Sequence, residues 1–335
     1  MTVEQLVSAP ESQSAERPHP DRELAIFVKS YAPDARLVAR LVASVARFNV
    51  DAIPTVLAVP DDEVAEFSPL AGGAATTVVP ESSLGAPIVT EKIRGYEVGY
   101  IQQQLAKLSI HRLGVARNYF VVDSDSMFIR PFSPADFLDG AGRPFTVLTQ
   151  DKDQLTDPGY ARFAALRAPM VGRIADYLSL PAQPRATSHN NTVLSAAVLE
   201  SFERWRDERG LSLIDLMEIA PLEYSWYNFY LQRHHPNLVV PIEPLVRMIH
   251  TRSEFRSLVR QGVTTESLSR SYIGVCINSG WAGRSQRRVL AKLERGSAAA
   301  RVRVRVDARR YALHQEIEFF KRARAREADG RHRRP

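Results

Sequence analysis

Two aspartates one residue apart, Asp123 and Asp125, are the residues of this sequence best suited to chemistry. They directly follow a short apolar run, and carboxylates at the end of a buried strand can converge on a hard divalent cation. The alternative is an Asp-x-Asp that arises by chance in a turn or a helix cap. The apolar run favours a metal site, where a cation would neutralise the diphosphate of a nucleotide leaving group.

Aromatic residues crowd the stretch 221–230 around one carboxylate, Glu223. Aromatic rings offer large apolar faces that suit the C–H surfaces of sugars, so Tyr224, Trp226 and Tyr227 are predicted to bind an acceptor. Glu223 is predicted to be the general base that takes the proton of the acceptor hydroxyl if the transfer inverts configuration, and whether it inverts or retains stays open. The alternative is an aromatic core helix whose first-turn glutamate stabilises the helix dipole.

Two polar runs are further candidates for the acceptor side. His189, Asn190 and Asn191 are predicted to open a helix whose backbone amides bind a hydroxyl or a phosphate. An ordinary helix cap is the alternative. Asp151 follows a predicted strand, so it either faces the acceptor or belongs to a solvated turn.

The elements that must position these residues alternate between strand and helix. Such alternation predicts a parallel sheet with right-handed crossovers, and ligands bind beyond the carboxyl ends of its strands. The loop 29–34 and the aspartate pair both lie at such ends. The predicted strands are 24–28, 53–59, 76–80 and 119–122, and the predicted helices are 34–48, 63–67 and 98–113.

The second half of the chain has a less regular pattern, and we expect one continuous domain over residues 23–283. Residues 1–22 have the Ser-, Pro- and Glu-containing composition of a disordered leader without the apolar core of a signal peptide. Residues 284–335 form a basic extension. The patterns predict strands at 145–148, 238–241 and 301–306, and helices at 160–168, 191–209, 222–233 and 307–326.

Charge is distributed unevenly along the 335 residues, whose formal net charge is +6. Residues 284–335 hold 17 Lys or Arg and 6 Asp or Glu, a balance of +11, so the rest of the chain carries −5. The body therefore does not have the charge of a nucleic-acid binder. The basic tail is predicted to touch an anionic membrane surface, or else to be a solvated helix that packs on the body.

The single cysteine, Cys276, excludes an internal disulfide and a Cys-rich zinc site, and it is expected to be a small buried hydrophobe. No stretch approaches the ~20 consecutive apolar residues of a membrane-spanning helix. The expected location is the cytoplasm, with peripheral contact at the inner face of the membrane.

A resemblance to a known family rests on residues 118–125 and the Phe128-Ile129-Arg130-Pro131-Phe132 run that follows. They resemble the Asp-x-Asp segment of GT-A glycosyltransferases, where an apolar strand, the two aspartates, an apolar residue and a proline follow one another. The helix 99–108, with its glutamines and Lys107, is similar to the helix before that strand. More narrowly, residues 23–280 resemble an uncharacterised bacterial family grouped with these transferases.

The resemblance implies a GT-A-like, Rossmann-type α/β fold with a mostly parallel sheet flanked by helices. It also implies a nucleotide-diphospho-sugar donor and a manganese or magnesium ion. Asp123 would contact the ribose or the metal, Asp125 the metal, and His250 would be a third ligand, although a lone histidine is more often structural. The residues that would contact the donor are Ser30, Tyr31, Lys107, Asp123 and Ser124, with Tyr31 stacking on the base or lying half-buried in a turn.

The leading hypothesis is a metal-dependent glycosyltransferase that uses a sugar, glycan or lipid-linked hydroxyl acceptor in surface polysaccharide or glycoconjugate synthesis. The first alternative is a nucleotidyltransferase that makes a nucleotide sugar. That class normally has a glycine-rich loop after the first strand, and residues 29–33 contain no glycine. The second alternative is a non-catalytic scaffold, against which the intact aspartate pair argues.

Overall fold

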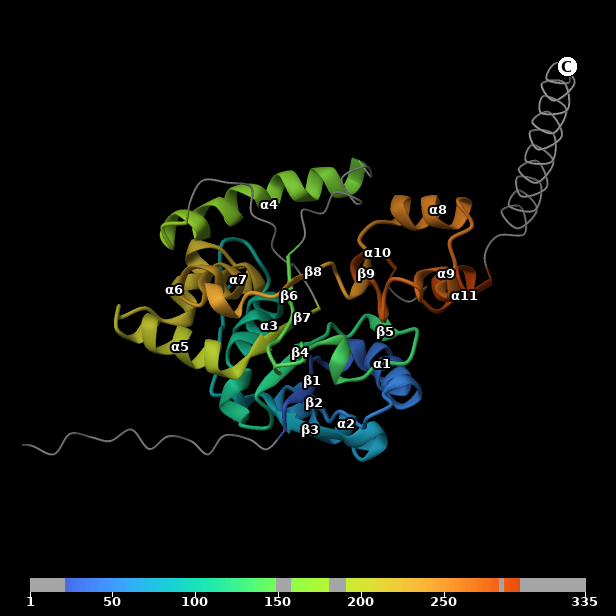
Figure 1. The fold of residues 1–335 in the computed structure, drawn as a ribbon, viewed down its shortest axis with the longest axis horizontal. Coiled ribbons are helices and arrows are strands. Elements are labelled where there is room, and N and C mark those ends of the chain that lie inside the picture. Colours follow the sequence, from blue (N-terminus) through green and yellow to red (C-terminus); the bar gives the residue numbers. More distant parts are fainter. Residues whose placement is uncertain (1–21, 149–157, 181–190, 283–285, 296–335) are drawn as a thin grey trace, which may run out of the picture.

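A computed structural model of the chain describes residues 22–148, 158–180, 191–282 and 286–295. Its centre is a five-stranded sheet in the order β3-β2-β1-β4-β7 (Figure 1). The first four strands run parallel, and β7 is antiparallel to β4. The strands are β1 (Leu24–Lys29), β2 (Thr55–Val59), β3 (Thr76–Pro80), β4 (Asn118–Val121) and β7 (Thr192–Ser195). The predicted fold class, a mostly parallel α/β sheet flanked by helices, is confirmed.

The chain builds this sheet outward from β1 in two directions. Helices α1 (Ala35–Phe48) and α2 (Val64–Phe67) lead to β2 and β3 on one side. Helix α3 (Val98–Leu108) and the 3-10 turn η6 (Ile110–Leu113) then bring the chain back to the other side of β1 as β4. The strand order therefore reverses between β1 and β4, and ligands of such sheets bind at the carboxyl ends beside this reversal.

The strands are apolar on both sides because both faces of the sheet are covered. In β1, Ala25 and Phe27 pack into one core cluster, whereas Ile26 and Val28 pack into the opposite one. All four are 0 % exposed. The uninterrupted apolar run in the sequence thus follows from burial on two sides rather than one.

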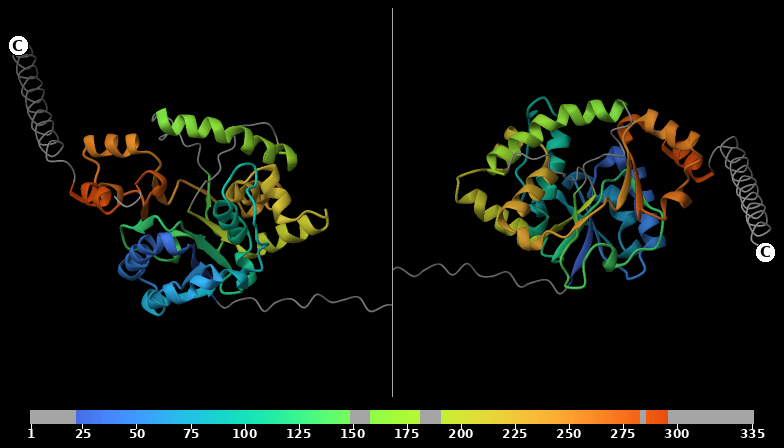
Figure 2. Two further views of the ribbon diagram at one scale, coloured as in Figure 1. Left: turned by 180° about the vertical axis from the view of Figure 1, so that it is seen from behind. Right: turned by 45° about the horizontal axis from the view of Figure 1, so that its top comes forward.

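One face is covered by α3 and by four helices of the second half, α4 to α7 (Figures 1 and 2). Helix α7 lies at the centre of this group, with Trp226 at 0 % and Phe229 at 0 % exposure. Helix α4 runs across the same side of the molecule. The helices added here are α4 (Pro158–Tyr177), α5 (Ala196–Asp207), α6 (Leu213–Ile219) and α7 (Glu223–His234).

The opposite face is covered by α1, α2 and a second sheet in the order β5-β10-β9. Helices α8 to α11 pack around the outer side of that sheet, where α11 contributes Val289, Leu290 and Leu293 to the core. These elements are β5 (Ser126–Phe128), β9 (Val246–Ile249), β10 (Gly274–Ile277), α8 (Arg252–Arg260), α9 (Thr265–Leu268), α10 (Ser279–Ala282) and α11 (Gln286–Arg295).

Short elements complete the described fold. Strands β6 (Thr146–Val147) and β8 (Pro241–Ile242) pair in parallel. Among the residues that the structure describes, no helix has the length and apolar character needed to cross a membrane. The remaining 3-10 turns are η1 (Ala32–Asp34), η2 (Asp61–Glu63), η3 (Ser68–Leu70), η4 (Gly73–Ala75), η5 (Glu81–Leu84), η7 (Pro134–Asp136) and η8 (Pro236–Leu238).

The predicted elements of the first half are all found, but three predictions for the second half need correction. Residues 192–195 form strand β7 rather than the start of a helix, because Val193 and Leu194 pair with β4 and are buried on opposite faces. Helix α4 is longer than predicted and continues through Pro169. The strand expected at 238–241 is replaced by η8 and the later β8. The elements predicted at 301–306 and 307–326, and the leader 1–22 up to residue 21, lie outside the described residues.

Gly274 allows close packing between β5 and β9. A Cβ at this position would lie 2.9 Å from Met127 O and 3.3 Å from Val246 Cγ2. We expect Gly274→Ala to lower the free energy of unfolding by about 1–3 kcal/mol, because strands on both sides must shift. Urea unfolding measures this. Gly99→Ala in α3 is the matched control, since its Cβ meets nothing within 4 Å, and an equal loss in both variants would contradict the packing argument.

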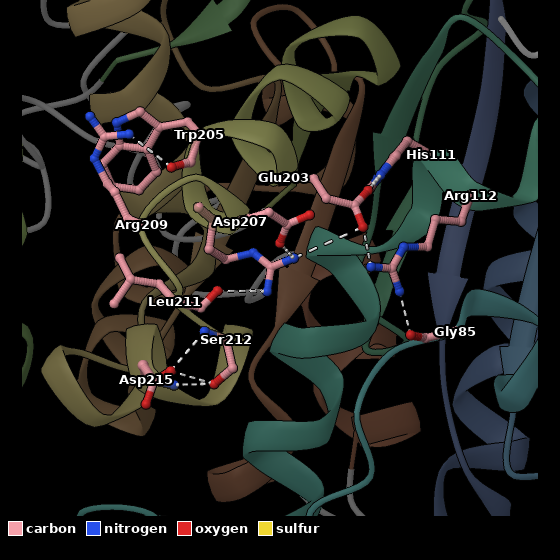
Figure 3. Close-up of polar contacts among 11 residues, drawn as sticks. Gly85, His111, Arg112, Glu203, Trp205, Asp207, Arg209, Leu211, Ser212 and Asp215 are labelled. Atoms are coloured by element: carbon pink, nitrogen blue, oxygen red, sulfur yellow. Dashed lines mark hydrogen bonds and ion pairs between the residues drawn. The ribbon is translucent and has the colours of Figure 1, made fainter. Parts of the chain in front are cut away.

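A partly buried ion-pair cluster ties α5 to η6 (Figure 3). His111 Nε2 lies 2.7 Å from Glu203 Oε2, and Arg112 pairs with the other oxygen of the same carboxylate. Arg206 approaches Glu203 at 3.9 Å and pairs with Asp207 at 3.0 Å. Hydrogen bonds and the charges of His111 and Arg112 lower the pKa of Glu203 to about 2, against the opposing effect of burial.

This depressed pKa predicts an acid-sensitive contribution to stability. The carboxylate of Glu203 stabilises the fold fully above its ordinary pKa of 4.5, and that contribution falls as the pH drops from 4.5 toward about 2. We expect Glu203→Gln to be less stable than the parent at neutral pH, and the difference to shrink through this window. Urea unfolding as a function of pH tests it; a constant difference from neutral pH to pH 2 would refute the assignment.

Candidate functional site

The aspartate pair lies where β4 ends beside β1, at the reversal of strand order. The chain turns after β4, and Ser126 N donates to Asp123 O (3.0 Å) as β5 begins. Asn191 holds this turn, because its Oδ1 accepts from Asp123 N (3.1 Å) and Ser126 Oγ (3.2 Å). Asn191 has φ of 47°, a left-handed conformation that asparagine tolerates better than most residues.

Lys107 joins the first aspartate to α7. Its Nζ lies 2.8 Å from Asp123 Oδ1 and 3.0 Å from Glu223 Oε1, and it sits 4.8 Å from the centre of the Tyr224 ring. Burial acts to lower the pKa of Lys107, but the charges of Asp123 and Glu223 outweigh it and raise the pKa well above the usual value. Gln104 adds a second link by accepting from Glu223 N (3.1 Å). Lys107 therefore stays charged while almost fully buried.

Asp125 is held from the other side by β10 and α10. Its Oδ2 accepts from Ser279 N (2.8 Å), and its Oδ1 accepts from Cys276 Sγ (2.9 Å). Burial and the neighbouring charge of Asp123 raise the pKa of Asp125 to about 6. The negative charge of Asp123 is thus near enough to disfavour ionisation of Asp125.

The carboxyl end of β1 forms the adjacent wall of the site. Ser30 is buried, whereas Tyr31 is 48 % exposed. Asp34 Oδ2 accepts from Ser124 Oγ (3.0 Å), which ties the loop after β1 to the residue between the two aspartates. Of the two residues predicted to contact a nucleoside here, the ring of Tyr31 is the accessible one.

The residues present fit a hard divalent cation. Asp123 uses Oδ1 for Lys107 and for Gln103 (3.4 Å), and among the described residues its Oδ2 has no hydrogen-bond partner. Carboxylate oxygens are the ligands that magnesium and manganese prefer, and a cation would relieve the repulsion that raises the pKa of Asp125. In the described part of the chain, no three His, Cys, Asp or Glu side chains are grouped to hold a metal ion.

His250 follows β9 at the same side of the second sheet as Asp125. Its backbone N donates to Glu254 Oε2 (2.9 Å). Burial, with the charges of Arg167 and Arg247, lowers the pKa of His250 to about 3, so its imidazole is neutral at physiological pH. A neutral imidazole is the metal-binding form, but His250 is not grouped with the aspartates into a three-ligand site in the described chain. Its role as third ligand stays a prediction.

The aromatic residues of α7 lie in the core. Trp226 and Tyr227 are 0 % and 1 % exposed, Trp226 Nε1 donates to Ala220 O (2.9 Å), and Tyr227 OH accepts from Ser195 N (2.8 Å). Tyr224 is 2 % exposed. Their predicted stacking on an acceptor is therefore wrong for this structure, because the ring faces are covered by other core side chains; the core-helix alternative describes them.

Asn191, one of the three polar residues predicted to open an acceptor-binding helix, has a different role from the one expected. Asn191 was predicted to open a helix that binds the acceptor, but a strand begins at Thr192, and the Asn191 side chain holds the aspartate turn. The correction follows from strand pairing, which the local sequence does not reveal. Asp151, His189 and Asn190 lie outside the described residues.

Sequence reasoning missed the contacts that orient the aspartates from far along the chain. Cys276 is buried as expected, but it also donates to Asp125, and Ser279 binds the same carboxylate through its backbone. They lie 151 and 154 residues from Asp125 in sequence. The apolar run before Cys276 identifies a strand, but only the pairing of β10 with β5 places that strand beside the aspartates.

Comparison with known proteins finds one family model that matches less than half of the chain and indicates no activity. Residues 24–165 match the model of a family described as a family of unknown function, DUF6492. The matched stretch contains β1 to β6, both aspartates and Lys107. None of the curated proteins compared with the chain matches it.

Proposed function

We propose that this protein is a metal-dependent glycosyltransferase that moves a sugar from a nucleotide-diphospho-sugar to a hydroxyl acceptor. The observation that carries the proposal is the position of Asp123 and Asp125 in the turn after β4 at the strand-order reversal, where Asp123 helps to raise the pKa of Asp125 and Asp123 Oδ2 has no hydrogen-bond partner among the described residues. Sheets of this kind bind nucleotides at that position. Asp123 and Asp125 would hold a manganese or magnesium ion, which supplies positive charge to the diphosphate leaving group when bound.

The surrounding residues would position Asp123 and contact the nucleotide of the donor. Lys107 holds Asp123 in place and keeps a positive charge beside it. Tyr31 offers an exposed ring for a nucleotide base at the end of β1. Ser30 and Ser124 lie at the same sheet edge, with Ser124 fixed by Asp34. A nucleotidyltransferase is disfavoured, because the loop after β1 contains no glycine to cradle a triphosphate.

The structure leaves two roles for Glu223, and kinetic measurements can distinguish them. It is 7 % exposed and paired with Lys107, so it is either the general base or a group that positions Lys107 and Asp123. If it is the base, Glu223→Gln lowers kcat for transfer by about 100-fold or more while donor affinity stays unchanged. If it is a positioning group, donor affinity falls together with kcat. Steady-state kinetics with donor titrations separate the two outcomes.

The proposed setting is the cytoplasm, with peripheral contact at the inner face of a membrane, where a glycan or lipid-linked acceptor for surface polysaccharide synthesis would be met. The balance of +11 over residues 284–335 supports that contact.

The proposal is tested by measuring nucleotide release from a panel of nucleotide-diphospho-sugars, with and without manganese. We expect metal-dependent release from one donor. Absence of metal-dependent binding to every donor would overturn the transferase proposal and favour the non-catalytic scaffold.

A further inference from the structure

Helix α8 carries three arginines along one side. Arg252, Arg256 and Arg260 are exposed and spaced four residues apart, which places them one above another on a helix. Among the described residues, neither Arg256 nor Arg260 has an ion pair or a side-chain hydrogen bond, and Arg252 donates to Trp281 O at 3.5 Å. Like charges at this spacing repel each other and destabilise the helix. An anionic partner would remove this repulsion.

The buried side of α8 shows that the arginine row faces outward. Phe255 is 6 % exposed and packs into the core around β9 and β10. Glu254 is 5 % exposed and pairs with Arg247 at 2.8 Å, so the acidic residue of this helix is turned inward. The outer side of α8 is left positively charged.

The other exposed residues between positions 252 and 295 also carry mainly positive charge. Between residues 252 and 295, the exposed acidic residues of the described chain are Glu266 and Glu294. The exposed basic residues outnumber them: Arg252, Arg256, Arg260, Arg270, Arg288, Lys292 and Arg295.

Helix α4 presents an exposed side that is mainly apolar. Arg162, Ala165, Leu166 and Pro169 recur at the spacing of one helix face, and all are exposed. Leu166 is 69 % exposed, high for so large an apolar side chain. The opposite side is anchored, since Ile174 is 0 % exposed. A cation followed by apolar residues on an outer helix face suits the boundary between lipid headgroups and acyl chains.

The two helices lie on the same side of the molecule. Figures 1 and 2 show α4 and α8 along the side away from β2, β3 and α2, in each of the three views. The inner side of α4 adjoins the candidate site, because Arg167 donates to Ser225 Oγ (3.4 Å), two residues after Glu223. A surface formed by α4 and α8 would therefore border the site.

We propose that the α4–α8 face, defined as Arg162, Leu166 and Pro169 of α4 with Arg252, Arg256 and Arg260 of α8, binds an anionic membrane surface. The arginines attract the headgroups, and Leu166 and Pro169 enter the interface. A nucleic acid would use the cations but would gain nothing from the apolar residues between them. This inference stands apart from the proposed catalytic function, and it assigns membrane contact to the folded body in addition to the basic tail.

Vesicle sedimentation with the full chain tests the proposal. The vesicles contain phosphatidylglycerol and phosphatidylcholine, or phosphatidylcholine alone. The first variant combines Arg252→Gln, Arg256→Gln and Arg260→Gln, and the second is Leu166→Gln. The matched control combines Arg36→Gln, Arg204→Gln and Arg233→Gln, which remove the same charge from exposed positions on α1, α5 and α7. Residues 296–335 remain in every protein, so the tail contributes equally.

We expect the parent chain to bind the anionic vesicles only. Each basic side chain near such a surface contributes about fivefold in affinity, so the α8 variant should bind at least about tenfold more weakly than the control variant. Leu166→Gln should also weaken binding, with less dependence on salt. Equal binding by the α8 and control variants, or no binding by the parent, would overturn the proposal. So would binding to a duplex oligonucleotide in place of vesicles. Donor release in solution, measured on the same variants, reports on the catalytic proposal separately.

Discussion

Asp125→Asn is expected to lower metal-dependent release of nucleotide from the donor by at least about 100-fold, because loss of a charged ligand removes several kcal/mol of stabilisation from the departing diphosphate. The substitution keeps the shape of the side chain and the oxygen that accepts from Ser279 N. The fold should therefore survive, and the lost charge should be the main change.

Stability should move in the opposite direction. Burial and the charge of Asp123 raise the pKa of Asp125 to about 6. The ionised carboxylate therefore destabilises the folded state at neutral pH. Asp125→Asn removes that cost, so we expect its free energy of unfolding without metal to equal or exceed that of the parent. Opposite effects on activity and stability are typical of a residue kept for function.

The control for this experiment is Asp62→Asn, which removes an exposed carboxylate from η2, the turn after strand β2. It should leave both donor release and stability unchanged. Donor release is measured over a manganese titration and stability by urea unfolding. If Asp125→Asn keeps the manganese response of the parent, the aspartate pair does not hold the metal.

Lys107→Met is expected to lower the free energy of unfolding by about 3–5 kcal/mol, because it leaves two carboxylates without their buried partner. Lys107 is paired with Asp123 at 2.8 Å and with Glu223 at 3.0 Å, and its own side chain is 5 % exposed. Glu223 cannot recover the lost interaction from water, since its side chain is 9 % exposed.

A second substitution should restore part of the loss. In Lys107→Met/Glu223→Gln the more deeply buried carboxylate becomes neutral, so the double variant should be more stable than Lys107→Met alone. Lys92→Met is the matched control, because Lys92 forms an exposed ion pair with Glu97, worth about 0–1 kcal/mol. Urea unfolding of the four proteins measures these differences. A loss for Lys107→Met no larger than that for Lys92→Met would contradict the network.

Most elements of the first half could be predicted because each has a local signal. β1, α1, β2, β3 and β4 coincide with apolar runs or helical periodicity in the sequence. Gly114 directly follows η6 with φ of 60°, a conformation that glycine adopts readily. In the second half the same signals were ambiguous. The apolar residues at 193 and 194 suit a helix as well as a strand, and only pairing with β4 makes them β7.

The part of the candidate site that lies at the carboxyl ends of the parallel strands could be predicted from the sequence. The position of Asp123 and Asp125 after a buried strand, and of Lys107 on the helix before it, follows from the order of elements along the chain. The order of elements did not reveal whether α7 is buried in the core or lines the site. A helix rich in aromatic residues can line a binding site or fill a core, and Trp226 and Tyr227 fill the core because neighbouring helices cover them.

The sequence by itself determined the α/β class, the strand that carries the two aspartates and the uneven distribution of charge, because these depend on local pattern and composition. The tertiary structure alone decided which distant groups hold the pair: Asn191, Glu223 through Lys107, and Cys276 with Ser279. It also decided that helices α4 and α8 lie on one side of the molecule (Figure 1). The physical reason is that hydrogen bonds, ion pairs and exposure depend on which elements pack together, and residues more than 60 apart in sequence leave no local sign of that packing.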